Sequence, residues 1–143
     1  MSTIEKAIEL ASREHAGMRD KAGAPYIFHP LRVMFAVSKP LEKIVAVLHD
    51  IVEDTPTTLG DLQKLGFPFE ALQALEALTR RKGESRMDAA KRAAENPIAL
   101  VVKLADVKDN MDLNRMENPT EKDFNRLKEY IKVKKYLESR AAT

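Results

Sequence analysis

One imidazole and three carboxylates occur together in residues 48–55, which read LHDIVEDT. On a continuous α-helix, with 100° per residue, these four polar side chains fall within an arc of about 140°. Leu48 and Ile51 fall on the opposite side, so the helix has an apolar back that can pack into a core. Carboxylates this close repel each other unless a cation or protons offset them. The stretch therefore predicts a metal site that is completed by residues from elsewhere in the chain.

The rest of the chain divides into further helical segments. Residues suited to helix starts and stops precede or follow apolar repeats at helical spacing. They are Ser2 or Thr3, Gly17, Pro30, Pro40, Thr58, Gly66, Pro68, Ser85, Pro97 and Thr120. In the last helix, Phe124, Leu127, Ile131 and Leu137 predict the apolar face. No run alternates apolar and polar residues as a half-buried strand does, so we expect one all-α domain over residues 1–143, with about seven or eight helices.

The composition is typical of a single globular domain and excludes several classes of function. The chain has 143 residues, of which 44% are hydrophobic and 32% charged. A net charge of +2 is too small to indicate a nucleic-acid partner, and the lack of cysteine excludes a thiolate zinc site. No apolar run approaches the roughly 18 residues of a membrane span, and no signal-peptide pattern begins the chain. We therefore expect a cytoplasmic protein with no nucleic-acid and no membrane partner.

Candidate metal ligands outside residues 48–55 are few. Taken alone, His29 before Pro30 is more often a capping or hydrogen-bonded residue than a ligand. Asp106 follows the apolar run 99–105, where a carboxylate must be solvated, paired or bound to a metal because burying an isolated charge is costly. In order along the chain, His29, the His49-Asp50 pair and Asp106 form an H…HD…D pattern. Two imidazoles and two carboxylates suit a divalent first-row metal that keeps positions open for water.

This pattern resembles the HD-domain superfamily of metal-dependent phosphohydrolases. More narrowly, residues 23–30 (GAPYIFHP), 48–55 (LHDIVEDT) and 102–111 (VKLADVKDNM) resemble the hydrolase domain of the RelA/SpoT family. That family degrades the alarmone (p)ppGpp of the stringent response. The single-domain small alarmone hydrolases are the most similar members, because no synthetase domain accompanies these motifs here. The resemblance runs from about His15 to Arg115 and implies that the helical domain is a single HD-domain bundle.

The resemblance implies metal ligands, an acidic pair that acts on the attacking water, and two substrate contacts. The implied metal ligands are His29, His49, Asp50 and Asp106. The implied acidic pair is Glu53 and Asp54, and the implied substrate contacts are Lys21 and Asn110. The implied cofactor is Mn²⁺, and the implied partner is a nucleotide substrate. From the residues alone, Lys21 is equally compatible with a surface loop and Asn110 with an ordinary helix terminus.

The expected activity is metal-dependent removal of the 3′ pyrophosphate from (p)ppGpp, and two alternatives stay open. The first is an HD-domain phosphohydrolase of another nucleotide. It is favoured by Asp20, which stands where the long family enzymes carry an arginine that can stack on guanine. The second is a non-catalytic nucleotide-binding module. The presence of Glu53 and Asp54 beside all four ligands argues against that alternative.

Overall fold

The computed structural model describes residues 2–142, which form an all-α bundle and confirm the expected fold class. Within this range there are nine helices and no strand, and one isolated bridge pairs Arg19 with Pro25. The helices are α1 (Ile4–Glu14), α2 (Phe28–Ala36), α3 (Pro40–Leu48), α4 (Ile51–Asp54), α5 (Leu59–Lys64), α6 (Phe69–Leu78), α7 (Arg86–Ala93), α8 (Pro97–Asn110) and α9 (Glu121–Ala141). Over residues 2–142, no helix combines the length and the apolar character that crossing a membrane requires.

Side-chain caps begin several helices at the residues that the sequence indicates. Thr58 and Ser85 each accept a hydrogen bond from the backbone N–H three residues later. Asp61 and Asp88, at those later positions, accept a bond from the backbone N–H of the cap. These reciprocal capping boxes satisfy donors that a helix start leaves unpaired. The short helix α5 then ends before Gly66, whose φ of 90° lies in the left-handed region that favours glycine.

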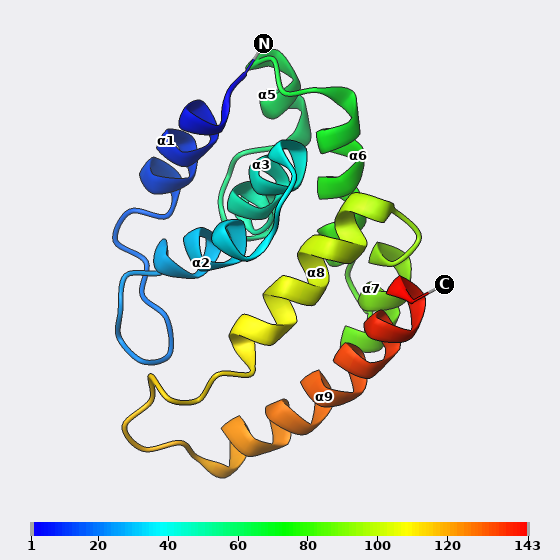
Figure 1. Ribbon diagram of the computed structural model, residues 1–143. Coiled ribbons are helices and arrows are strands. Elements are labelled where there is room, and N and C mark those ends of the chain that lie inside the picture. Colours follow the sequence, from blue (N-terminus) through cyan, green and yellow to red (C-terminus); the bar gives the residue numbers. More distant parts are fainter. Residues whose placement is uncertain (1, 143) are drawn as a thin grey trace.

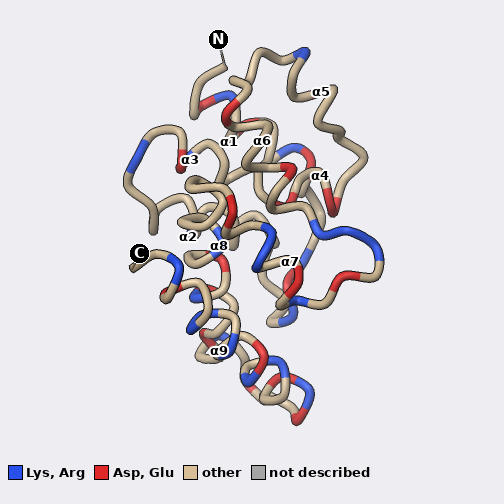
Figure 2. The backbone as a smooth tube through the Cα atoms, turned by 90° about the vertical axis from the view of Figure 1, so that its right-hand side faces the viewer, with Lys and Arg blue, Asp and Glu red and all other residues tan. Residues whose placement is uncertain are grey.

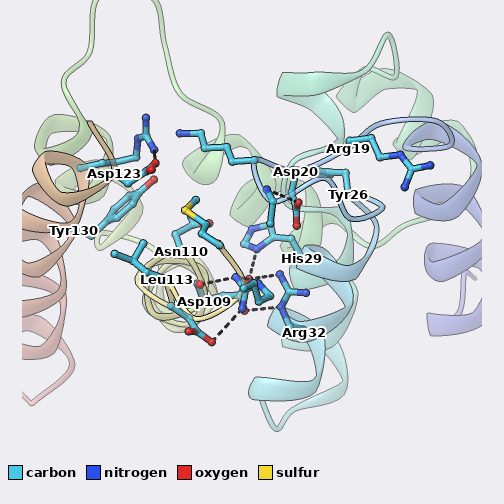
Figure 3. Close-up of a pocket in the computed structure, with 16 residues that line it drawn as sticks. Arg19, Asp20, Tyr26, His29, Arg32, Asp109, Asn110, Leu113, Asp123 and Tyr130 are labelled. Atoms are coloured by element: carbon cyan, nitrogen blue, oxygen red, sulfur yellow. Dashed lines mark hydrogen bonds and ion pairs between the residues drawn. The ribbon is translucent and has the colours of Figure 1, made fainter. Parts of the chain in front are cut away.

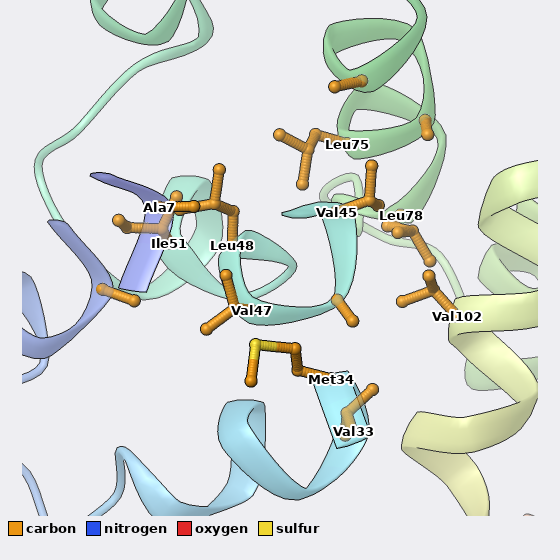
Figure 4. Close-up of a cluster of buried hydrophobic side chains, with 14 of the residues drawn as sticks. Ala7, Val33, Met34, Val45, Val47, Leu48, Ile51, Leu75, Leu78 and Val102 are labelled. Carbon is orange, nitrogen blue, oxygen red and sulfur yellow. The ribbon is translucent and has the colours of Figure 1, made fainter. Parts of the chain in front are cut away.

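Helix α3 lies at the centre of the bundle, and α1, α2, α6 and α8 pack around it (Figure 1). Val45 and Leu48 of α3 are fully buried in one hydrophobic cluster with Leu75 of α6 and Val102 of α8 (Figure 4). Burying one such side chain contributes about 1.5–3 kcal/mol to the hydrophobic stabilisation. The residues that follow Leu48 are therefore attached directly to the hydrophobic core.

The continuous helix expected over residues 48–55 is interrupted. Helix α3 ends at Leu48 and α4 begins at Ile51, so His49 and Asp50 form a junction between two helices. The His49 ring Nδ1 lies 2.6 Å from the carbonyl oxygen of Ala46, which an uninterrupted helix would offer to the N–H of Asp50. The side chain thus competes with the backbone for this acceptor. The apolar back is as expected, since Leu48 and Ile51 are both fully buried.

Helix α9 packs along α7 and α8 (Figure 1). Its buried residues are Val133 and Leu137, whereas Phe124 and Ile131 are 49% and 37% exposed. The predicted face is therefore confirmed at Leu137 and wrong at Phe124 and Ile131. The helix turns Val133 and Leu137 toward Val107 and Ala90. Positive and negative residues are interspersed along α9 (Figure 2).

Candidate metal centre and active site

Side chains from three parts of the chain meet beside the C-terminal end of α3. His29 lies in the first turn of α2, His49 and Asp50 form the α3–α4 junction, and Asp106 lies in α8. One ligand atom each of His29, His49 and Asp106 lies within 4.8 Å of the others. The Oδ2 atom of Asp50 lies 3.1 Å from His49 Nε2 and 3.7 Å from His29 Nε2. The structure thus brings together the four side chains that the sequence motifs single out.

The chemistry of these groups fits a divalent cation. The Nδ1–H of His49 donates to the carbonyl oxygen of Ala46, so the neutral ring has its lone pair on Nε2. Burial lowers the pKa of His49, but Asp50 and Asp106 outweigh it and raise this pKa well above its ordinary value. This Nε2 is buried and has no hydrogen-bond partner within residues 2–142, although it lies 3.1 Å from Asp50 and 3.3 Å from Asp106. A buried nitrogen lone pair that faces two carboxylates is what a metal ion requires. The His29, His49 and Asp106 cluster can therefore hold a metal ion.

Charges within the cluster shift the pKa values of its members. Burial lowers the pKa of His29, but hydrogen bonds to Asp106 and Asp109 outweigh it and raise this pKa to about 9. Burial raises the pKa of Asp106, but Lys103 and His49 outweigh it and hold this pKa well below its ordinary value. Without a metal ion, a proton therefore lies between His29 and Asp106 at neutral pH, where their atoms are 2.8 Å apart. Metal binding at Nε2 must release this proton.

The acidic pair Glu53 and Asp54 lines the same cavity as the cluster. We call this cavity, of about 210 Å³, the catalytic cavity after the activity that the sequence motifs lead us to expect, and it also has His29, Asp50 and Asp106 in its lining. Partial burial and the Asp50 and Glu53 carboxylates raise the pKa of Asp54 to about 6. Burial and Asp50 likewise raise the pKa of Glu53. The cavity therefore combines a cluster that can hold a metal ion with a carboxylate whose pKa suits proton transfer near neutral pH.

The catalytic cavity also has a cationic wall. Arg80 and Arg86 line it from the loop before α7 and from the start of that helix, and Lys103 lines it from α8. Such groups can offset the negative charge of a phosphate that enters beside the acidic pair.

A second cavity of about 290 Å³ adjoins the first, and we call it the outer cavity (Figure 3). The two cavities have Tyr26, His29, Asn110 and Tyr130 in common. The side chain of Asn110 also donates to Asp106 Oδ1 at 3.2 Å, so the structure brings this residue to the cluster. Lys21 is exposed and lines only the outer cavity of the two. The two residues expected to contact substrate thus lie at different distances from the cluster.

Asp20 shapes the loop before α2. Its Oδ1 accepts hydrogen bonds from the backbone N–H groups of Ala22 and Ala24, both at 2.9 Å. Arg19 also bonds within this loop, since its guanidinium donates to the carbonyl oxygen of Gly23. The carboxylate of Asp20 therefore has a structural task in a segment that lines the outer cavity.

Sequence reasoning missed three residues that hold the cluster. The Tyr26 hydroxyl donates to Asp50, Lys103 Nζ lies 3.1 Å from Asp106 Oδ2, and Asp109 Oδ2 lies 2.6 Å from His29 Nδ1. The spacing of Lys103 and Asp109 around Asp106 in the sequence could have indicated two of them. Lys103 and Asp109 lie three residues before and after Asp106, which places all three on one face of a helix.

Fold and site together define the class of protein: an all-α domain with a histidine–aspartate centre of the HD hydrolase type. No family model matches the chain. The mouse (Mus musculus) protein guanosine-3′,5′-bis(diphosphate) 3′-pyrophosphohydrolase MESH1 is 34% identical over 140 residues, which cover 88% of this chain and 77% of MESH1. The chain therefore belongs to the family of guanosine-3′,5′-bis(diphosphate) 3′-pyrophosphohydrolases, and the resemblance inferred from the motifs is confirmed.

Two further similarities agree with this assignment. A guanosine-3′,5′-bis(diphosphate) 3′-pyrophosphohydrolase of Spiroplasma citri is 38% identical over 84 residues, but these cover 56% of this chain and only 11% of that protein. The chain thus spans a small part of the long relatives. A solved structure described as a metazoan ortholog of SpoT that hydrolyzes ppGpp matches with a TM-score of 0.77, at 23% identity, over 94% of this chain and 84% of its own. That match supports the fold.

Proposed function

We propose that this chain is a metal-dependent hydrolase that removes the 3′ pyrophosphate from guanosine 3′,5′-bis(diphosphate), with Mn²⁺ as its cofactor. The observation that carries the proposal is the shared cavity in which Glu53 and Asp54 face the histidine–aspartate cluster. The names of the relatives supply the substrate class. We also propose that the reaction takes place in the cytoplasm.

The cluster residues His29, His49, Asp50 and Asp106 would hold the ion. Two nitrogen and two oxygen ligands suit Mn²⁺ among the first-row metals available to such a site. When bound, the ion supplies Lewis acidity at phosphorus and lowers the pKa of a water molecule toward neutrality. The protein contributes the geometry, since the ligands are attached to the well-packed helices α2, α3 and α8.

Asp54 is the proposed base, and Glu53 is proposed to orient the attacking water. With a pKa of about 6, the Asp54 carboxylate is ionised at neutral pH yet basic enough to accept a proton. Attack on the phosphorus nearest the ribose breaks its bond to the 3′ oxygen. The proton taken from water passes to that oxygen as it leaves, which gives GDP and pyrophosphate. The cationic side chains of Arg80, Arg86 and Lys103 offset the charge of the departing diphosphate.

The nucleoside and its 5′ phosphates would occupy the outer cavity. Asn110 lines both cavities, so it is placed to contact a substrate that spans them, and Lys21 supplies a cation from the loop before α2. A second candidate is hydrolysis of another nucleotide. It is favoured by Asp20, whose carboxylate bonds the loop backbone and offers no guanidinium plane for guanine.

The test is a screen for pyrophosphate and phosphate release over a panel of nucleotides that includes ppGpp, with Mn²⁺ and with chelator. GDP and pyrophosphate formed from ppGpp only with Mn²⁺ support the proposal. Turnover of a different nucleotide alone would favour the second candidate, and binding without turnover would indicate a non-catalytic module. Asp50→Ala is the matched inactive variant, and Lys132→Ala, on the exposed part of α9, is the control that is expected to retain activity.

A further inference from the structure

The ring of His29 is held from both sides by carboxylates of one helix. Its Nε2 faces the cluster, 2.8 Å from Asp106 Oδ1. Its Nδ1 lies on the other side of the ring, 2.6 Å from Asp109 Oδ2 (Figure 3). Asp109 follows Asp106 by three residues on α8, so both carboxylates point toward α2. The side chains of His29 and Asp109 are only 7% and 12% exposed. This second carboxylate stands behind the ring, on the side that a metal ion would not occupy.

Asp109 is in turn fixed by Arg32, one turn after His29 on α2. The Nε of Arg32 donates to Asp109 Oδ1 at 2.7 Å, and its Nη2 donates to Oδ2 at 3.0 Å. Such paired bonds fix the plane of a carboxylate as well as its charge. Arg115 adds a contact of 3.7 Å to Oδ2 and donates to the backbone carbonyl of Asp109. These charge-assisted bonds attach α2 to α8 directly behind the cluster.

We infer that Asp109 is a positioning residue for the metal centre: it accepts the Nδ1–H of His29, so that the Nε2 lone pair is directed at the ion. Arg32 keeps Asp109 in place for this task. A histidine without an acceptor at Nδ1 can rotate or carry its proton on Nε2, and either change removes a ligand. The inference rests on the proposed metal centre and adds residues that hold it.

Metal affinity measured without substrate tests this role. Removing an outer hydrogen-bond partner of a metal-bound histidine typically weakens metal binding by about 10–100-fold. We expect Asp109→Ala to weaken Mn²⁺ binding by this factor in a titration followed by electron paramagnetic resonance. Asp109→Asn keeps an acceptor oxygen and is expected to lose less, as is Arg32→Gln. Asp112→Asn is the matched control, because Asp112 pairs with Arg115 and, within residues 2–142, makes no hydrogen bond or ion pair with His29. This variant should bind Mn²⁺ like the wild type.

Nitrogen NMR of ¹⁵N-histidine-labelled, Zn²⁺-loaded protein reports the protonation of each ring nitrogen, and so it distinguishes the proposed role of Asp109 from a general structural defect. In the wild type, we expect a protonated Nδ1 on His29, and in Asp109→Ala we expect this signal to shift or broaden. His49 serves as an internal control, since its Nδ1 donates to the Ala46 carbonyl and should stay unchanged in both proteins.

Three results separate the inference from the proposed function. Wild-type Mn²⁺ affinity in a folded Asp109→Ala protein, or an unchanged His29 signal, would overturn the inference alone. A wild-type protein that binds Mn²⁺ but does not hydrolyse ppGpp would overturn the proposed substrate. In that case, a lower Mn²⁺ affinity of the Asp109→Ala variant would still support the inference. A wild type that binds no Mn²⁺ would overturn both.

Discussion

Replacing Asp54 by asparagine is expected to remove the proposed base while leaving the metal ligands in place. Asp54 lies in the catalytic cavity, four residues after Asp50, and belongs to the one-turn helix α4. Asparagine keeps the size of the side chain and its hydrogen bonding but cannot accept the proton. The loss of positioned proton transfer lowers a rate by about 10²–10⁴. We therefore expect kcat to fall by this factor, which corresponds to about 2.7–5.5 kcal/mol of activation free energy.

The raised pKa of Asp54 also predicts how the activity depends on pH. In the protein without a metal ion, burial and the carboxylates of Asp50 and Glu53 raise this pKa to about 6, so the base becomes protonated as the pH falls through that value. The activity should then fall about tenfold for each pH unit below about 6, as expected for one essential base. An aspartate with an ordinary pKa of about 3.9 would keep its activity down to about pH 4. In Asp54→Asn this acid limb should disappear, because the group that titrates is gone.

The assay is pyrophosphate release from ppGpp at saturating Mn²⁺ over a range of pH, with the metal content of each variant measured. Glu53→Gln serves as the companion variant, and the double variant should lose less than the product of the two single losses if the pair acts as a unit. Near-wild-type turnover of both single variants would refute the assignment. An acid limb that persists in Asp54→Asn would show that another group is the base.

Three further predictions concern the cluster, the core and a loop. Asp106→Ala is expected to abolish Mn²⁺ binding while circular dichroism still shows a helical domain; loss of the helices would mean that Asp106 is mainly structural. Leu48→Ala, at a fully buried site, is expected to lower the free energy of unfolding by about 2–5 kcal/mol in urea titrations, and an unchanged midpoint would contradict the central position of α3. Arg92→Met removes bonds to Glu84 and to the carbonyls of residues 76, 77 and 79, so Tm should fall by several degrees at pH 7. Because the pKa of Glu84 is lowered to about 2, this difference in Tm should shrink as the pH falls toward that value, and a difference that does not depend on pH would contradict the pairing.

Helix starts were predictable from the sequence because capping is local. Thr58, Ser85 and Thr120 each cap the helix that follows them. The order of histidines and aspartates also indicated which side chains would meet, although His29 and Asp106 are 77 residues apart. The family motif therefore indicated which distant residues meet in the fold, and helical spacing alone does not indicate this.

What the sequence did not indicate depends on packing between distant segments. The junction at His49 forms because a side chain competes for one backbone acceptor, and helical periodicity contains no sign of this competition. The buried face of α9 was predicted correctly at Leu137 but misassigned elsewhere, because apolar residues occur on more than one side of that helix. Phe124 and Ile131 lie on the exposed side of α9, whereas Val133 is buried because it packs against residues of α7 and α8. The Asp109–Arg32 pair was missed for the same reason, since it joins α8 to α2.

The wide spacing of the cluster along the chain has a consequence for folding. In an unfolded chain, groups as far apart as His29 and Asp106 do not form a site, so an ion held by the cluster binds only the native state. At a free metal concentration of about 100 times Kd, such selective binding adds about 2.7 kcal/mol to the stability of the native state. Metal supply would then affect the small unfolded fraction as well as the rate at which each molecule turns over. Withdrawing the ion would raise that unfolded fraction about a hundredfold, while most molecules would keep the helical fold.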